Sequence, residues 1–123
     1  MLNIKPFLTK IKQYFSPRVN YNRYSYTNRK NGLYVEYHPN GQLKFIGNYL
    51  NYARDGIWVS YYPNGKTSWI GQYKNGFKHN LWVEYYDNGH EFSKREYVNG
   101  KEYGLCEEYP FKNGETKITE FHI

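Results

Sequence analysis

The sequence predicts an all-β fold: an antiparallel meander of about four 24-residue β-hairpin repeats that form an extended single-layer sheet, preceded by a short N-terminal amphipathic helix. Three observations support this prediction. Similar segments recur every 24 residues, Asn-Gly turn signals recur with them, and the apolar residues are mostly aromatic, with 16 Tyr, 7 Phe and 3 Trp among 123 residues. Tyrosine suits a thin sheet with half-buried faces, because it joins an apolar ring to a polar hydroxyl group.

The repeat is visible in residues that lie 24 positions apart, namely Gly32, Gly56, Asn80 and Gly104. Similar residues follow each of them, as in GLYVEYHPNG and GIWVSYYPNG. A fixed period of this length is typical of repeat architectures, in which each unit packs only on its neighbours.

The fourth unit departs from the pattern, and such degeneration is typical of a terminal cap. Cys106 stands where the second and third units have Trp, Glu107 stands where all three preceding units have Val, and an insertion lies near Phe111. Asn80 replaces Gly in the third unit, and the pair Lys94-Arg95 replaces an apolar residue and Gly. Both departures predict a locally bulged or edge-exposed strand.

Each unit is predicted to be a hairpin, because two runs rich in aromatic and β-branched residues flank an Asn-Gly pair. Asn and Gly tolerate the positive φ angles of tight turns. The first strands are expected at Leu33–His38, Ile57–Tyr62 and Leu81–Tyr86, and the second strands at about Leu43–Tyr49, Thr67–Tyr73 and Glu91–Tyr97.

The two faces of the predicted sheet differ, because side chains alternate along a strand. One face receives Leu33, Val35 and Tyr37 with their equivalents, and it is predicted to be the packing side. The opposite face is aromatic with a line of carboxylates, and we predict a partner-binding surface there. Its candidate residues are Tyr34, Trp58, Tyr62, Trp82 and Tyr86. The alternative is that these rings only pack on one another across strands.

The pattern G-x-W-x-x-Y-Y-x-N-G in Gly56–Gly65, followed by G-x-Y-x-N-G in Gly71–Gly76, resembles MORN repeats. It is closest to the MORN variant of the YwqK-like bacterial antitoxin family and of proteins from large DNA viruses, and the resemblance covers about residues 31–123. It implies a scaffold for protein–protein interaction, and phospholipid binding has also been proposed for such arrays. The resemblance assigns no role to any individual residue.

Residues 1–30 are predicted to form a basic N-terminal helix and a leading half repeat, ahead of a MORN-like repeat domain at 31–123. Apolar residues recur at helical spacing within Asn3–Phe15, and lysines surround them. Such a helix either lies on an anionic membrane or caps the sheet. The residues concerned are Ile4, Lys5, Phe7, Leu8, Lys10, Ile11, Lys12 and Phe15.

The net charge of +6 is concentrated at the N-terminus. Residues 1–30 carry seven basic and no acidic side chains, whereas residues 31–123 carry 10 basic and 11 acidic side chains. Nucleic acid is therefore not an expected partner of the sheet. The single Cys excludes an internal disulfide framework, and no stretch approaches the roughly 20 apolar residues of a membrane span. We expect a cytoplasmic location, with membrane association left open.

No catalytic, cofactor-binding or metal site is predicted. Glu36, Glu84 and Glu108 recur because the repeat recurs, and Cys106 lies in no nucleophile motif. The histidines, expected to face solvent near turns and strand ends, show no metal-ligand spacing; they are His38, His79, His90 and His122. We therefore expect a non-enzymatic scaffold with a protein partner. The alternatives are attachment to an anionic membrane and antitoxin-like neutralisation of a toxin, and the oligomeric state is left open.

Overall fold

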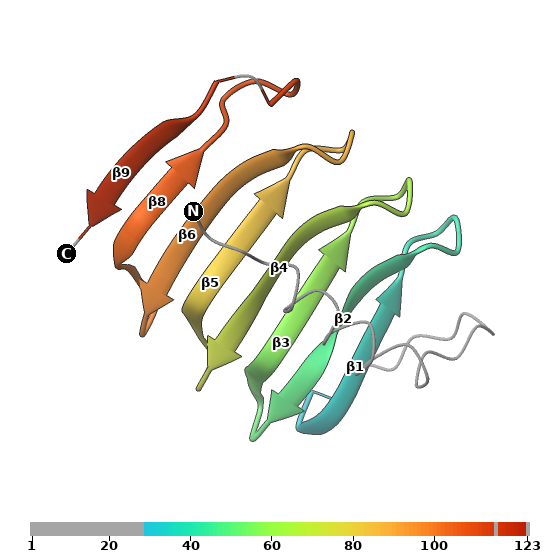
Figure 1. The fold of residues 1–123 in the computed structure, drawn as a ribbon. Helices are drawn as coiled ribbons and strands as arrows, with labels where there is room; N and C mark the ends of the chain where they lie inside the picture. Colours follow the sequence, from blue (N-terminus) through green and yellow to red (C-terminus); the bar gives the residue numbers. More distant parts are fainter. Residues whose placement is uncertain (1–28, 115, 123) are drawn as a thin grey trace.

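The computed structural model describes residues 29–114 and 116–122. They form one open antiparallel sheet, and no helix occurs among them (Figure 1). The strands are β1 (Asn31–Tyr37), β2 (Leu43–Leu50), β3 (Ala53–Tyr61), β4 (Thr67–Lys74), β5 (Phe77–Tyr85), β6 (Glu91–Val98), β7 (Lys101–Glu102), β8 (Gly104–Glu108) and β9 (Ile118–His122).

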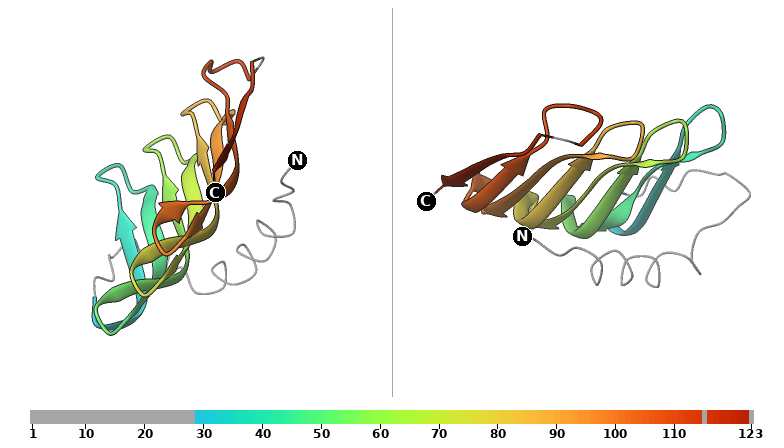
Figure 2. Two further views of the ribbon diagram at one scale, coloured as in Figure 1. Left: turned by 90° about the vertical axis from the view of Figure 1, so that its left-hand side faces the viewer. Right: turned by 45° about the horizontal axis from the view of Figure 1, so that its top comes forward.

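The strands follow one another through space in sequence order, from β1 to β6 and then β8 and β9, while the short β7 pairs with β6. Figure 2 shows that the described strands lie in a single layer. The predicted all-β antiparallel meander is thus confirmed. The predicted helix and leading half repeat fall almost wholly on residues 1–28, which lie outside the described residues.

In the Asn-Gly turns that join β1 to β2, β3 to β4 and β5 to β6, the Asn and the Gly have different roles, as the first of these turns shows. Gly41 has a φ of +88°, and its N–H donates to the His38 carbonyl at 2.9 Å. Asn40 is not in the positive-φ region; instead its side chain accepts a hydrogen bond from the Gln42 N–H at 3.0 Å and donates to the Pro63 carbonyl of the next turn at 2.6 Å. The same link to the next turn recurs at Asn64 and Asn88.

Asn64→Ala is expected to lower the free energy of unfolding by about 1 kcal/mol, because the turn loses both side-chain hydrogen bonds in an exposed setting. Urea denaturation measures the change. Asn64→Asp retains the acceptor for the Lys66 N–H and is expected to lose less. An alanine variant as stable as the wild type would show that these links between turns contribute nothing.

At the opposite end, Asn75-Gly76 and Asn99-Gly100 form the two-residue turns in which both residues have positive φ, with values of +52° and +81° and of +49° and +84°. This is the backbone geometry that the Asn-Gly signal predicts.

The residue that recurs every 24 positions also has positive φ, at +70° in Gly56 and +59° in Asn80. It lies where the register shifts between neighbouring strands, opposite Ile46/Asn48 for Gly56 and opposite Ile70/Gln72 for Asn80. Asn tolerates positive φ better than most other residues, so the β-bulge that this register shift represents also forms at Asn80.

The core is a row of aliphatic side chains that are cross-strand neighbours on one face: Val35, Ile46, Val59, Ile70 and Val83, each at most 3% exposed. The packing role predicted for this face is confirmed. Lys94 and Glu107 continue the row and are also buried.

The prediction of a bulged or edge-exposed strand at Lys94-Arg95 is confirmed for the bulge and wrong for the edge. Both residues lie in β6, an interior strand, and they pair in unbroken register with Val83 and Trp82 of β5. On the other side of β6 the register shifts between the pairs Lys94–Glu107 and Tyr97–Glu102. The buried ammonium group of Lys94 is 3.2 Å from the Glu91 carboxylate, so the strand accommodates the charge by pairing it.

Candidate interaction site on the aromatic face

The structure divides the five predicted binding residues into two groups. Tyr34, Trp58 and Trp82 are 4%, 0% and 3% exposed, whereas Tyr62 and Tyr86 are half-buried. The first three rings are therefore buried packing residues of the aromatic face, and a partner could reach only other residues of this face.

The two buried indoles lie over glycines of the neighbouring strand. A Cβ atom at Gly47 would overlap the Trp58 ring, and one at Gly71 would overlap the Trp82 ring. Trp58 Nε1–H donates to the Asn48 carbonyl, and Trp82 Nε1–H to the Gln72 carbonyl, both at 2.9 Å. Sequence reasoning missed these glycines, although Gly47 and Gly71 are themselves 24 residues apart.

A cation of the same chain covers each of these indoles. The Arg54 guanidinium is 4.5 Å from the Trp58 ring centroid, and the Lys78 ammonium is 4.6 Å from that of Trp82. These are cation–π distances, so this face already binds cations where the chain supplies them.

Further along the strands, one cross-strand row contains two aromatic side chains among polar ones. Strand register places these residues side by side in the order Glu36, Phe45, Ser60, Trp69, Glu84, Ser93 and Glu108. The three glutamates foreseen from the repeat thus belong to one row, and the aromatic members Phe45 and Trp69 come from second strands, which the sequence argument did not consider for this face.

A hollow of about 260 Å³ opens beside this row. Its lining residues are Tyr62, Ser68, Trp69, Glu84, Tyr85, Tyr86 and Phe92. Trp69 stacks on Trp82 with ring centroids 4.8 Å apart, and Tyr86 meets Phe92 edge to face at 5.2 Å. We call the group Tyr62, Trp69, Glu84, Tyr86 and Phe92 the Glu84 hollow.

Hydrogen bonds to the neighbouring repeat fix the two tyrosines of the hollow. Tyr62 O–H donates to the Tyr85 carbonyl at 2.6 Å, and Tyr86 O–H donates to the Tyr109 carbonyl at 2.9 Å. His38 occupies the equivalent position in the first repeat, and its Nε2 is 2.7 Å from the Tyr61 carbonyl. This ring is therefore held in the sheet, and the expectation that His38 simply faces solvent is wrong.

The carboxylates of the row differ in their partners. Glu36 accepts a hydrogen bond from Tyr34 O–H at 2.8 Å and lies 3.3 Å from Lys44 Nζ. Partial burial raises the pKa of Glu36, but the bonds from Tyr34 and Lys44 outweigh it and hold the pKa below its ordinary value. Glu108 pairs with Arg95.

Glu84 is the exception: within residues 29–114 and 116–122 it has neither an ion pair nor a hydrogen-bonded side-chain partner. The reason is one substitution in the repeat. Phe92 lies 48 residues, or two periods, after Lys44. Strand β6, which pairs with the strand of Glu84, therefore carries a phenyl ring at the position where β2, which pairs with the strand of Glu36, carries an ammonium group. Within the described residues, the hollow therefore presents a carboxylate without an ion pair among aromatic rings, and the nearest cation recorded over one of these rings is Lys112 Nζ, 6.0 Å from the Tyr86 centroid.

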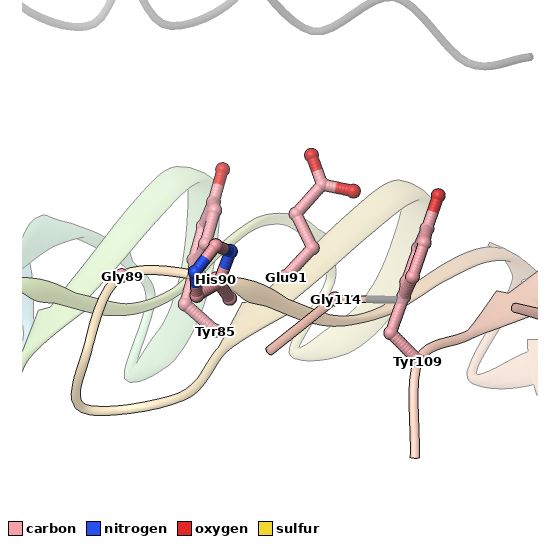
Figure 3. A pocket seen from close by; sticks show the side chains of 6 residues that line it. All are labelled: Tyr85, Gly89, His90, Glu91, Tyr109 and Gly114. Atoms are coloured by element: carbon pink, nitrogen blue, oxygen red, sulfur yellow. The ribbon is translucent and has the colours of Figure 1, made fainter. Parts of the chain in front are cut away.

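A second hollow, of about 320 Å³, is lined by Tyr85, Gly89, His90, Glu91, Tyr109 and Gly114. Figure 3 shows Glu91 standing between the rings of Tyr85 and Tyr109. Burial, together with the nearby Glu91 charge, raises the pKa of Tyr85 to about 12. Because Glu91 is already paired with Lys94, this hollow offers a partner less uncompensated charge than the Glu84 hollow does.

The residues predicted for the N-terminal helix, from Ile4 to Phe15, lie outside the described residues. In the part of the chain that the structure covers, no helix has the length and apolar character that crossing a membrane requires.

Residues 30–51 and 54–75 match the family model of the MORN repeat variant. Residues 30–75 thus hold two MORN-variant repeats. The first match contains β1 and β2. The second contains β3 except for Ala53, and all of β4, and so includes both Trp58 and Gly71. No curated protein matches the sequence.

Proposed function

We propose that the chain is a non-enzymatic MORN-type scaffold that binds a protein partner on its aromatic face, with a lysine or arginine side chain of the partner seated in the Glu84 hollow. The observation that carries the proposal is the Glu84 carboxylate, which lies among aromatic rings and has no ion pair within residues 29–114 and 116–122, whereas Glu36 and Glu108 each have one. A basic side chain of a partner completes the same arrangement.

The chemistry of the hollow favours such a guest. Ring faces attract cations by about 0.5–1 kcal/mol at exposed sites and by about 2 kcal/mol or more where water is excluded. A carboxylate adds a charge-assisted hydrogen bond to ammonium or guanidinium groups. The rings of Tyr62 and Tyr86 are already fixed by hydrogen bonds, so little conformational entropy is lost when a guest binds.

Wild-type protein is expected to bind peptides that carry a central Lys or Arg more strongly than matched peptides with acetyl-lysine or citrulline. An array of immobilised peptides with randomised flanks measures this preference. Glu84→Gln should weaken it, because the carboxylate is lost. Phe92→Lys should abolish it, because the new ammonium group occupies the hollow as Lys44 does beside Glu36.

The matched control is Phe77→Lys, the same substitution at an exposed ring on another part of the sheet, and it should retain the preference. Equal binding of charged and neutral peptides by the wild type, or an unchanged preference in a folded Phe92→Lys variant, would contradict the proposal.

Antitoxin-like neutralisation of a toxin is one specific form of this protein binding, supported by the resemblance to the YwqK-like family. A toxin encoded beside the gene, whose binding depends on Glu84, would support it. Attachment to an anionic membrane through residues 3–15 is the alternative from another class. It predicts liposome co-sedimentation that disappears when residues 1–17 are deleted.

A further inference from the structure

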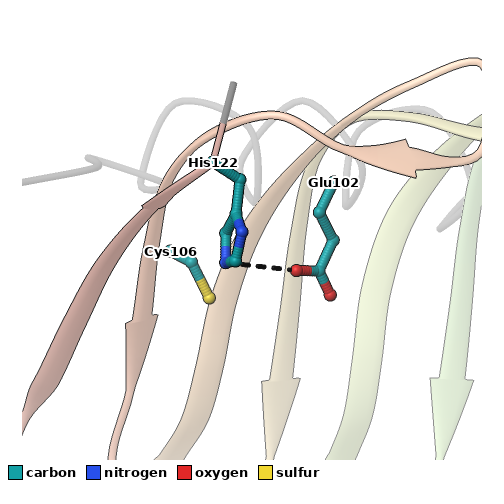
Figure 4. A group of neighbouring side chains, drawn as sticks. All are labelled: Glu102, Cys106 and His122. Atoms are coloured by element: carbon teal, nitrogen blue, oxygen red, sulfur yellow. Dashed lines mark ion pairs between the residues drawn. The ribbon is translucent and has the colours of Figure 1, made fainter.

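Three side chains of metal-ligating type converge at the C-terminal end of the sheet. Glu102 comes from β7, Cys106 from β8 and His122 from β9, and their ligand atoms all lie within 4.8 Å of one another. Figure 4 shows the His122 ring between the Cys106 thiol and the Glu102 carboxylate. The positions of the three residues in the sequence do not match a known metal-binding motif, and only strand pairing brings their side chains together.

The convergence follows from the altered fourth repeat. In the earlier repeats a Trp ring covers a Gly of the preceding strand, whereas here Cys106 stands at the Trp position and Arg95 at the Gly position. The small thiol leaves room that an indole would fill. Register then adds β9, because Cys106 pairs with Glu120 and Gly104 pairs with His122, which places these side chains on the same face.

The charges around this space do not balance within the described residues. Glu102, Glu108 and Glu120 contribute three carboxylates, and Arg95 is the one permanently charged cation paired with any of them. His122 Nε2 lies 3.4 Å from Glu102 and 3.3 Å from Glu120, yet this buried nitrogen has no hydrogen-bond partner there. A divalent cation would supply the missing positive charge.

The Cys106 thiol is a second unused ligand. The residue is 2% exposed and free of any disulfide. Burial is the main factor that raises the pKa of this thiol, while Arg95 opposes the shift and neighbouring carboxylates add to it. A metal ion binds cysteine as the thiolate, so binding at Cys106 would release a proton.

We propose that Cys106 Sγ, His122 Nε2 and the Glu102 carboxylate form a binding site for a zinc-type divalent cation, with Glu120 as the fourth ligand. Thiolate, imidazole and carboxylate together are a ligand set that Zn²⁺ accepts in tetrahedral geometry, at about 2.0–2.3 Å from each ligand atom. The ligand atoms of Cys106, His122 and Glu102 already lie within 4.8 Å of one another, and the Glu120 carboxylate is 3.3 Å from His122 Nε2.

Such a site would tie the last strand to the rest of the sheet. β9 pairs only with β8 among the described strands, and His122 lies at its end. A metal ion bound to His122, Cys106 and Glu102 would link β9 directly to β7 and β8, and so protect the open edge of the array from fraying.

Titration of the untagged, reduced full-length chain with Co²⁺ tests the proposal, because Co²⁺ reports the ligands of a zinc site. One equivalent is expected to give the visible bands of a tetrahedral centre and a near-ultraviolet thiolate-to-cobalt charge-transfer band, and Zn²⁺ should displace it. Cys106→Ser should remove the charge-transfer band, and His122→Ala should weaken binding by more than about tenfold. His90→Ala, a histidine distant from the cluster in the sheet, is the matched control and should bind as the wild type does.

A wild-type titration without the charge-transfer band, or Co²⁺ affinity that is unchanged in His122→Ala, would overturn the proposal. Circular dichroism establishes that each variant is folded. If Cys106→Ser does not fold, Glu102→Gln serves in its place, because the Glu102 side chain is only half-buried; unchanged metal affinity in this variant would equally overturn the site.

Discussion

Trp82→Ala is expected to lower the free energy of unfolding by about 3–5 kcal/mol, the range found for buried aromatic side chains. The ring is 3% exposed, stacks on Trp69 at 4.8 Å and meets Tyr73 edge to face at 5.0 Å. Its removal leaves a cavity and also leaves the Gln72 carbonyl without its 2.9 Å hydrogen bond. Chemical denaturation followed by circular dichroism measures the loss.

The control for this variant is Tyr52→Ala, because Tyr52 is 72% exposed and its loss should cost little. A Trp82→Ala variant that loses less than about 1 kcal/mol would contradict the structural role of the indole.

Gly71→Ala is expected to destabilise the protein by about 1–3 kcal/mol, because the added methyl group would overlap the Trp82 ring. The backbone at Gly71 is not in the positive-φ region, so the effect isolates packing from strain. The same measurement of unfolding applies to this variant.

A double-mutant cycle gives the control. Gly71→Ala should cost much less in the Trp82→Ala background, since the ring that it overlaps is then absent. The next unit of the chain shows the same dependence. Arg95 stands 24 residues after Gly71, and there the residue 24 positions after Trp82 is the small Cys106. Equal costs in both backgrounds would show that the ring is not what requires the glycine.

The fold could be predicted from the sequence because its signals are local. Alternation along each strand and the Asn-Gly turns depend on residues close together in the chain, and the 24-residue period repeats both signals. The structure confirms the sheet that they predict. The predicted N-terminal helix lies outside the described residues.

The site was predicted only in part, because its features depend on register between strands. Alternation assigns Trp58 and Trp82 to the aromatic face, but it does not reveal that glycines in the preceding strands allow the rings to lie flat and buried. Similarly, Glu84 looks equivalent to Glu36 within the repeat. The difference arises from Phe92 and Lys44 on the neighbouring strands, and only cross-strand pairing shows it.

The most direct test of the Glu84 hollow is an NMR titration of the isotope-labelled protein with N-acetyl-arginine amide, compared with the citrulline analogue. The arginine compound is expected to shift the Trp69 indole and the signals of Tyr62, Glu84 and Phe92, and Phe92→Lys should remove these shifts. If the neutral analogue causes the same shifts, or if the shifts fall outside the hollow, binding of a basic side chain at Glu84 is contradicted.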